Sequence, residues 1–255
     1  GLVALAGMLA EYFGAIEGAS IDANKGAYSS AWMIIFAVIA AVMVLLGLYH
    51  IKMLPSTQVP ATGKKSTSEI MQDLVNVIGN FFTKKHIVYY IFFIILYRLA
   101  EGFIMKVAPL FLRASREVGG LGLSLTEIGT LNGVFGSAAF VIGSLLGGIF
   151  VARYGLKKTL FMLCCVFNLP FLAYTFLAVV QPTSLYLIGT CITMEYFGYG
   201  FGFVGLTLFM MQQIAPGKHQ MSHYAFASGI MNLGVMLPGM ISGYFSDLLG
   251  YRSFF

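Results

Sequence analysis

The stretch YYIFFIIL, residues 89–96, decides the fold class of this 255-residue chain. It shows none of the alternation between polar and apolar residues that a strand of a transmembrane barrel requires. It lies within an apolar run over residues 87–112. As a helix, about 20 residues are enough to cross a hydrocarbon layer of roughly 30 Å. The run therefore predicts a transmembrane helix.

The composition extends this prediction to the whole chain. Hydrophobic residues make up 58% of it and charged residues 10%, whereas a soluble domain has about 45–50% and 25%. A chain of this length cannot bury so much apolar surface, so the excess needs lipid as its solvent. The basic residues are scattered between apolar runs, so the net charge of +5 does not indicate a nucleic-acid partner.

Seven apolar runs follow one another along the chain. They cover residues 2–16, 31–52, 87–112, 127–151, 159–180, 184–212 and 222–245. Short polar or glycine-rich breaks separate them, which predicts an all-α polytopic membrane protein with about seven transmembrane helices. The loops after the second, fourth and sixth runs carry nine Lys or Arg residues, and the other loops carry four. The richer side is predicted to face the cytoplasm.

A long polar stretch divides the chain into two groups of helices. We expect residues 1–52 to hold the last two transmembrane helices of a first bundle, with the first helix truncated. Residues 53–86 are predicted to form a cytoplasmic linker that contains an amphipathic segment over 70–82. Residues 87–255 are predicted to form a second bundle that lacks most of its last helix. The chain is accordingly interpreted as a fragment of a longer protein.

Three charged residues lie deep inside the predicted membrane helices. Arg98 is about 16 Å and Glu101 about 21 Å from the start of their helix, and Glu195 is about 16 Å from the opposite face. An ionised side chain at this depth costs from about 2.5 to well over 10 kcal/mol, so each must be paired, neutral or next to water. We expect a functional charge layer. A structural ion pair between Arg98 and Glu101 that only sets the helix register is the alternative.

Polar residues near this layer are candidates for binding a substrate. Tyrosines can stack on a sugar ring or donate hydrogen bonds, and asparagines can do the latter. The candidates are Tyr97, Tyr196, Tyr199 and Asn232. No grouping of His, Cys or Asp supplies metal ligands or a nucleophile with its base, so we expect no metal, no cofactor and no enzymatic activity.

Several motifs resemble a known family. The segment GGIFVARYGLKK, residues 147–158, is similar to the cytoplasmic loop signature of the major facilitator superfamily, carried here by Gly148, Arg153, Gly155, Lys157 and Lys158. Within that superfamily, four further segments resemble the AmpG-like muropeptide permeases. They are LYRLAEGF (96–103), SLTEIGTLNGVFG (124–136), MEYFGYGFG (194–202) and SHYAFASG (222–229).

The resemblance implies a proton-coupled permease of the bacterial inner membrane that imports anhydromuropeptides during peptidoglycan recycling. Its expected partners are a muropeptide-like substrate, protons, the lipid bilayer and the N-terminal half of the same transporter. Either Glu101 or Glu195 would carry the proton. Arg98 would restrain one of these carboxyls or pair with a carboxylate of the substrate. A facilitator for a sugar, drug or acyl-coenzyme A, and a membrane sensor that binds muropeptides without transporting them, are the alternatives.

Overall fold

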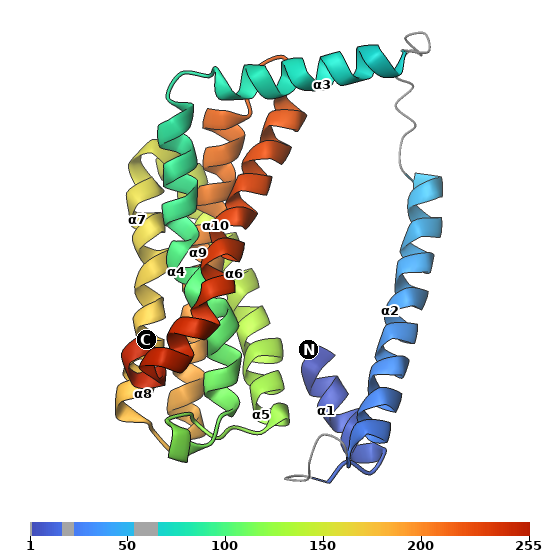
Figure 1. Cartoon of the computed structure of the whole chain (residues 1–255), viewed down its shortest axis with the longest axis vertical. Coiled ribbons are helices and arrows are strands. Elements are labelled where there is room, and N and C mark those ends of the chain that lie inside the picture. Colours follow the sequence, from blue (N-terminus) through green and yellow to red (C-terminus); the bar gives the residue numbers. More distant parts are fainter. Residues whose placement is uncertain (1, 17–22, 54–65) are drawn as a thin grey trace.

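The computed structural model describes residues 2–16, 23–53 and 66–255, and every regular element within these ranges is helical (Figure 1). This confirms the predicted all-α fold. Five stretches in the described residues are long and apolar enough to cross a membrane. They are Lys25–Met53, Ile87–Arg113, Leu125–Tyr154, Leu156–Val180 and Gln220–Leu249.

The other two predicted transmembrane segments, residues 2–16 and 184–212, also form helices but are not among these five. Helix α1 (Leu2–Tyr12) has 11 residues. Helix α9 (Leu185–Phe209) has 25 residues and packs against α6 and α7 in the bundle. Its glycines and Glu195 lower its hydropathy, and the glycines allow close packing with its neighbours.

The main bundle consists of antiparallel helices, two of which are interrupted. Its elements are α4 (Ile87–Arg113), α5 (Leu125–Thr130), α6 (Ser137–Tyr154), α7 (Leu156–Asn168), α8 (Leu172–Val180), α9 and α10 (Gln220–Leu249), with a short α11 (Tyr251–Phe254). A π-helical turn, Leu131–Gly136, separates α5 from α6. The 3-10 turn Leu169–Phe171 separates α7 from α8, where Pro170 has no backbone N–H to donate. The sequence predicted one uninterrupted helix in place of α5 and α6, and another in place of α7 and α8.

Local sequence signals explain where two helices begin. At α5, Ser124 Oγ accepts a hydrogen bond from the backbone N–H of Glu127 at 3.2 Å, and the Glu127 carboxylate accepts one from Ser124 N at 2.8 Å. This capping box satisfies N–H groups that have no partner inside the helix. Ser66 and Glu69 form the same motif at α3 (Thr67–Phe82).

Two apolar clusters fill the bundle, one toward each end. The cluster near α3 contains Leu163, Phe167 and Leu206, and the other contains Phe111 and Leu177. In both α4 and α9, buried polar residues lie between the part of the helix that belongs to the first cluster and the part that belongs to the second. The apolar clusters thus leave a middle layer in which the charged residues lie.

Glycines allow α6 and α9 to approach each other closely. A Cβ atom added to Gly147 would lie 2.4 Å from the carbonyl oxygen of Phe201, and one added to Gly200 would lie 2.2 Å from that of Phe140. Real Cβ atoms do not tolerate such distances, so only glycine fits at these positions. Small residues at helix contacts are a common means of packing helices in lipid.

Helix α3 lies across one end of the bundle (Figure 1). Its Phe81 is fully buried against the bundle. Just after α3, the Lys84 ammonium donates hydrogen bonds to the carbonyls of Ile214 and Pro216, in the segment that follows α9, and burial lowers the pKa of Lys84. Residues 70–82, predicted to be an amphipathic segment, thus lie within helix α3, while residues 54–65 lie outside the described residues.

Helices α1 and α2 (Lys25–Met53) stand to one side of the bundle (Figure 1). Helix α1 contacts both α2 and α5. Of the residues in α2, Ala31 and Ile35 are buried. Most of the apolar surface of α2 is therefore free of contacts with the described parts of this chain.

Candidate functional site

Arg98 and Glu101 form a two-point ion pair on α4. Arg98 Nε donates to Glu101 Oε2 at 2.6 Å, and Arg98 Nη2 donates to Glu101 Oε1 at 2.5 Å. Both side chains are buried, and the guanidinium also lies 5.4 Å from the centre of the Phe203 ring. Their spacing of three residues places them on one face of the helix. Both carboxylate oxygens of Glu101 are therefore bound by the same arginine.

A cavity of about 150 Å³ lies beside this pair. Glu101 and Glu195 both line it, so α4 and α9 bring the two carboxyls to one space. Glu195 is 9% exposed, and within the described residues it has no ion-pair partner. The cavity thus contains one carboxyl that is neutralised and one that is not.

The structure separates the predicted substrate contacts into two groups. Tyr196 and Tyr199 line the cavity, and Tyr199 is close enough to Arg98 and Glu101 to interact with both. Tyr97 does not line it, because its hydroxyl donates to the carbonyl of Gly202 at 2.7 Å inside the helix packing. Asn232 is exposed on α10 and does not line it either.

Asn132 lines the cavity but was not predicted as a substrate contact. It belongs to the π-helical turn between α5 and α6, and π-helical turns often occur at functional sites. Its Oδ1 atom is buried and has no hydrogen-bond partner in the described part of the chain. The available signal was a polar residue inside an apolar run with a glycine directly after it, at Gly133. This pattern is too common to identify a site by itself.

The loop motif forms the tight turn between α6 and α7. Gly155 has a φ of +80°, a conformation that favours glycine, and α7 begins at the next residue. Arg153, Lys157 and Lys158 are exposed there, whereas Gly148 lies inside α6 with open space beside it. Residues next to this turn belong to the same apolar cluster as Phe81 of α3. The turn is therefore at the end of the bundle that α3 crosses.

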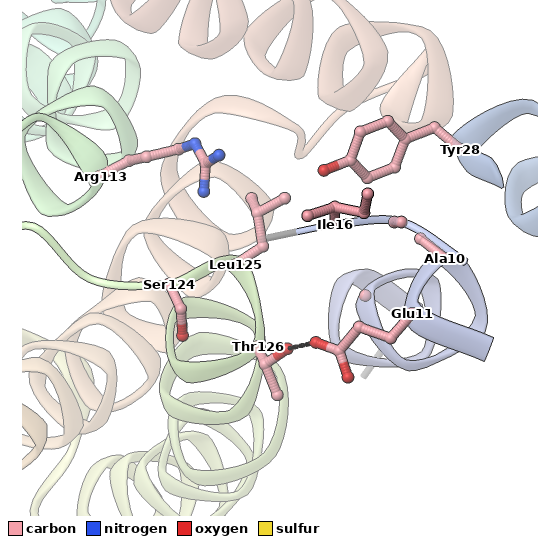
Figure 2. A pocket seen from close by; sticks show the side chains of 10 residues that line it. Ala10, Glu11, Ile16, Tyr28, Arg113, Ser124, Leu125 and Thr126 are labelled. Carbon is pink, nitrogen blue, oxygen red and sulfur yellow. Dashed lines mark hydrogen bonds between the residues drawn. The ribbon is translucent and has the colours of Figure 1, made fainter. Parts of the chain in front are cut away.

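A second pocket, of about 240 Å³, lies where α1 and the start of α2 meet α5 (Figure 2). Thr126 Oγ1 donates a hydrogen bond to Glu11 Oε1 at 3.1 Å, and Arg113 extends into the pocket from the other side. Gly7 allows α1 to approach Thr126. The pocket thus marks the contact between the α1–α2 pair and the main bundle. Neither here nor elsewhere in residues 2–16, 23–53 and 66–255 do three or more His, Cys, Asp or Glu residues cluster as metal ligands would.

Comparison with known proteins identifies relatives of this chain. It is 24% identical over 184 residues to the anhydromuropeptide permease of Escherichia coli, which covers 72% of this chain and 36% of the relative. Proteins named AmpG 1 and AmpG 4 in Rickettsia conorii are 23% and 24% identical, over 81% and 98% of this chain. These matches cover 47% and 57% of the two relatives. The predicted resemblance to the AmpG-like permeases is confirmed.

The model of the Major Facilitator Superfamily matches residues 1–214, which include the polar cavity, the glycine contacts of α9 and the loop motif. The chain spans between about a third and somewhat more than half of the length of the curated relatives it matches. The family is one of transporters, which agrees with the prediction that the protein is not an enzyme. The chain belongs to the Major Facilitator Superfamily and is a multi-pass membrane protein of a transporter family.

Proposed function

We propose that this chain is part of a proton-coupled importer of anhydromuropeptides in the bacterial inner membrane. The observation that carries the proposal is Glu195, a buried carboxyl without an ion-pair partner among the described residues, on a cavity shared with Glu101. A proton carrier must be able to exist in both its neutral and its charged form, and a carboxyl beside a cavity meets this requirement.

The ion pair of Arg98 favours Glu195 over Glu101 as the carrier. Protonation of Glu101 would remove its charge and so abolish the two-point ion pair, which would leave the arginine buried without its counter-charge. Protonation of Glu195 breaks no ion pair among the described residues. In this proposal Arg98 therefore restrains Glu101 and does not bind a carboxylate of the substrate, and Glu195 loads and releases the proton.

The arrangement of α1 and α2 supports an alternating-access mechanism, in which a central cavity opens to one side of the membrane at a time. The relatives are longer than this chain, so we assign α1 and α2 to a first bundle and α4–α10 to a second. Helices α1 and α5 contact each other at the end of the bundle away from α3 (Figure 1). We assign α3 and the basic turn at Gly155 to the cytoplasmic side, since cytoplasmic loops are rich in Lys and Arg.

The test is uptake of a labelled anhydro-disaccharide-peptide by right-side-out vesicles that contain the full-length transporter. With acid outside, we expect accumulation above the external concentration, and collapse of the pH gradient by a protonophore should abolish it. Vesicles without the transporter are the control. Binding without accumulation would indicate a sensor, and accumulation that ignores the gradient would exclude proton coupling.

A further inference from the structure

Helix α3 is held on the bundle by two side chains near its C-terminal end. Phe81 is fully buried, and the centre of its ring lies 5.6 Å from that of Phe226 in α10. Lys84 donates hydrogen bonds to two backbone carbonyls in the segment that follows α9. An apolar contact and a charged side chain thus fix α3 to the bundle.

His223 of α10 is covered by this contact. It is 3% exposed, its ring centre lies 5.7 Å from that of Phe81, and the backbone of Val77 in α3 is also close to the ring. Both ring nitrogens are buried, and neither has a hydrogen-bond partner in the described ranges. With α3 in place, neither water nor another part of a longer transporter reaches these nitrogens.

The groups that face His223 disfavour a positive charge on its ring. They are Lys84 and His219, and the ring of His219 lies 5.9 Å away. Glu69 and Asp73, the acids of α3, are both exposed. A protonated His223 would thus be a buried cation next to the ammonium of Lys84, and an unpaired buried charge is costly. The protonated ring must reach water, which requires α3 to move away.

We propose that His223 makes the attachment of α3 to the bundle sensitive to pH. Helix α3 is attached while the ring is neutral, and it is released when the ring takes up a proton. The released state binds the proton more readily than the attached state does, so attachment weakens as the pH falls. Below about pH 6.5, the pKa of an exposed imidazole, each further unit lowers the attachment constant by up to about tenfold.

The position of α3 in the chain gives its release a consequence. It belongs to the segment that joins the α1–α2 pair to the bundle, so its release lengthens the free part of that connection. In the proposed importer, α3 faces the compartment into which protons are carried, and acid that accumulates there would release it. Only this last step rests on the proposed function.

The test is hydrogen–deuterium exchange of the backbone amides of α3 in the purified full-length protein, corrected for the effect of pH on intrinsic exchange. Between about pH 7.5 and about pH 5.5, the protection of these amides should fall about tenfold in the wild type. The amides of α6 should keep their protection. His223→Phe places an apolar ring at the site and should keep α3 protected at both pH values. If this variant does not fold, His223→Gln gives the same comparison, because an amide does not titrate.

His50→Gln is the matched control, since His50 is an exposed histidine in the last turn of α2. It should show the same fall in the protection of α3 as the wild type. Equal protection of α3 at both pH values in the wild type, or a fall in the His223 variants as large as in the wild type, would overturn the proposal. Loss of protection in α6 together with α3 would also overturn it, because α3 would then not be released by itself. The measurement involves no substrate, so its result is independent of the proposed transport function.

Discussion

Helices α2 and α9 have similar lengths and opposite surroundings. In α2, 29 residues with a mean hydropathy of 2.8 in the most apolar part of the helix include two buried ones. In α9, 25 residues include ten buried ones, among them five glycines and Glu195. Helix α2, although it is the longer of the two and contains a strongly apolar part, is thus the less buried one. In lipid, apolar side chains can face outward, and close packing in the centre depends on small residues.

The difference teaches where to look for function in such a chain. High hydropathy marks surfaces that lipid or another part of the transporter can cover. The residues that lower hydropathy, the glycines and the carboxyl of Glu195, mark the packed centre and its cavity. Predictions that compare central with peripheral positions therefore test this view of the molecule.

The largest effect on stability is expected from the central ion pair. Glu101→Leu should lower the free energy of unfolding by about 3–5 kcal/mol, because it leaves the charge of Arg98 buried and unpaired. Denaturant unfolding of the purified protein measures this change. The double variant Arg98→Leu with Glu101→Leu removes both charges and should be more stable than Glu101→Leu. A double variant that is less stable than either single variant would contradict this account.

A smaller but still large difference in the free energy of unfolding is expected between leucine-to-alanine variants in α9 and in α2. Leu206 of α9 is fully buried, whereas Leu46 of α2 is 45% exposed. Leu206→Ala should therefore cost about 2–5 kcal/mol, and Leu46→Ala at most about 0.5 kcal/mol. The same unfolding assay compares them. Equal losses would show that α2 is packed against protein as tightly as α9 is.

The next effect concerns two adjacent glycines of α6. Gly147→Ala should lower the free energy of unfolding by about 1–3 kcal/mol, because the added methyl group meets the backbone of α9 at Phe201. Gly148→Ala is the matched control, since open space lies beside it, and it should be neutral or slightly stabilising. Similar effects of both changes would show that α6 and α9 are not in close contact.

Charged residues inside the apolar runs could be identified as site candidates from the sequence, whereas a neutral polar residue of the cavity could not. Arg98, Glu101 and Glu195 could be singled out because a charge in an apolar run needs a reason. Asn132 could not, because a neutral amide inside a membrane helix usually bonds to a neighbouring helix. The π-helical turn on which it lies leaves no clear trace in the pattern of apolar residues.

The tyrosines show the same limit. Tyr97 and Tyr199 are both close in sequence to a charged residue, so sequence alone gives them equal weight. Which of them reaches the cavity depends on helix packing. The hydroxyl of Tyr97 is bound by the carbonyl of Gly202, whereas Tyr199 lines the cavity. The helices were therefore predictable from the sequence, and which tyrosines line the cavity was not.

The most direct test of the account is Glu195→Gln in the full-length transporter, assayed in vesicles with a labelled anhydro-disaccharide-peptide. Glutamine keeps the size and the hydrogen-bonding capacity of the side chain but cannot carry a proton. Accumulation driven by a pH gradient should be lost, while exchange of labelled for unlabelled substrate across the membrane should persist. If the variant still accumulates substrate against its gradient when only the pH gradient drives it, Glu195 is not the proton carrier and the central claim is wrong.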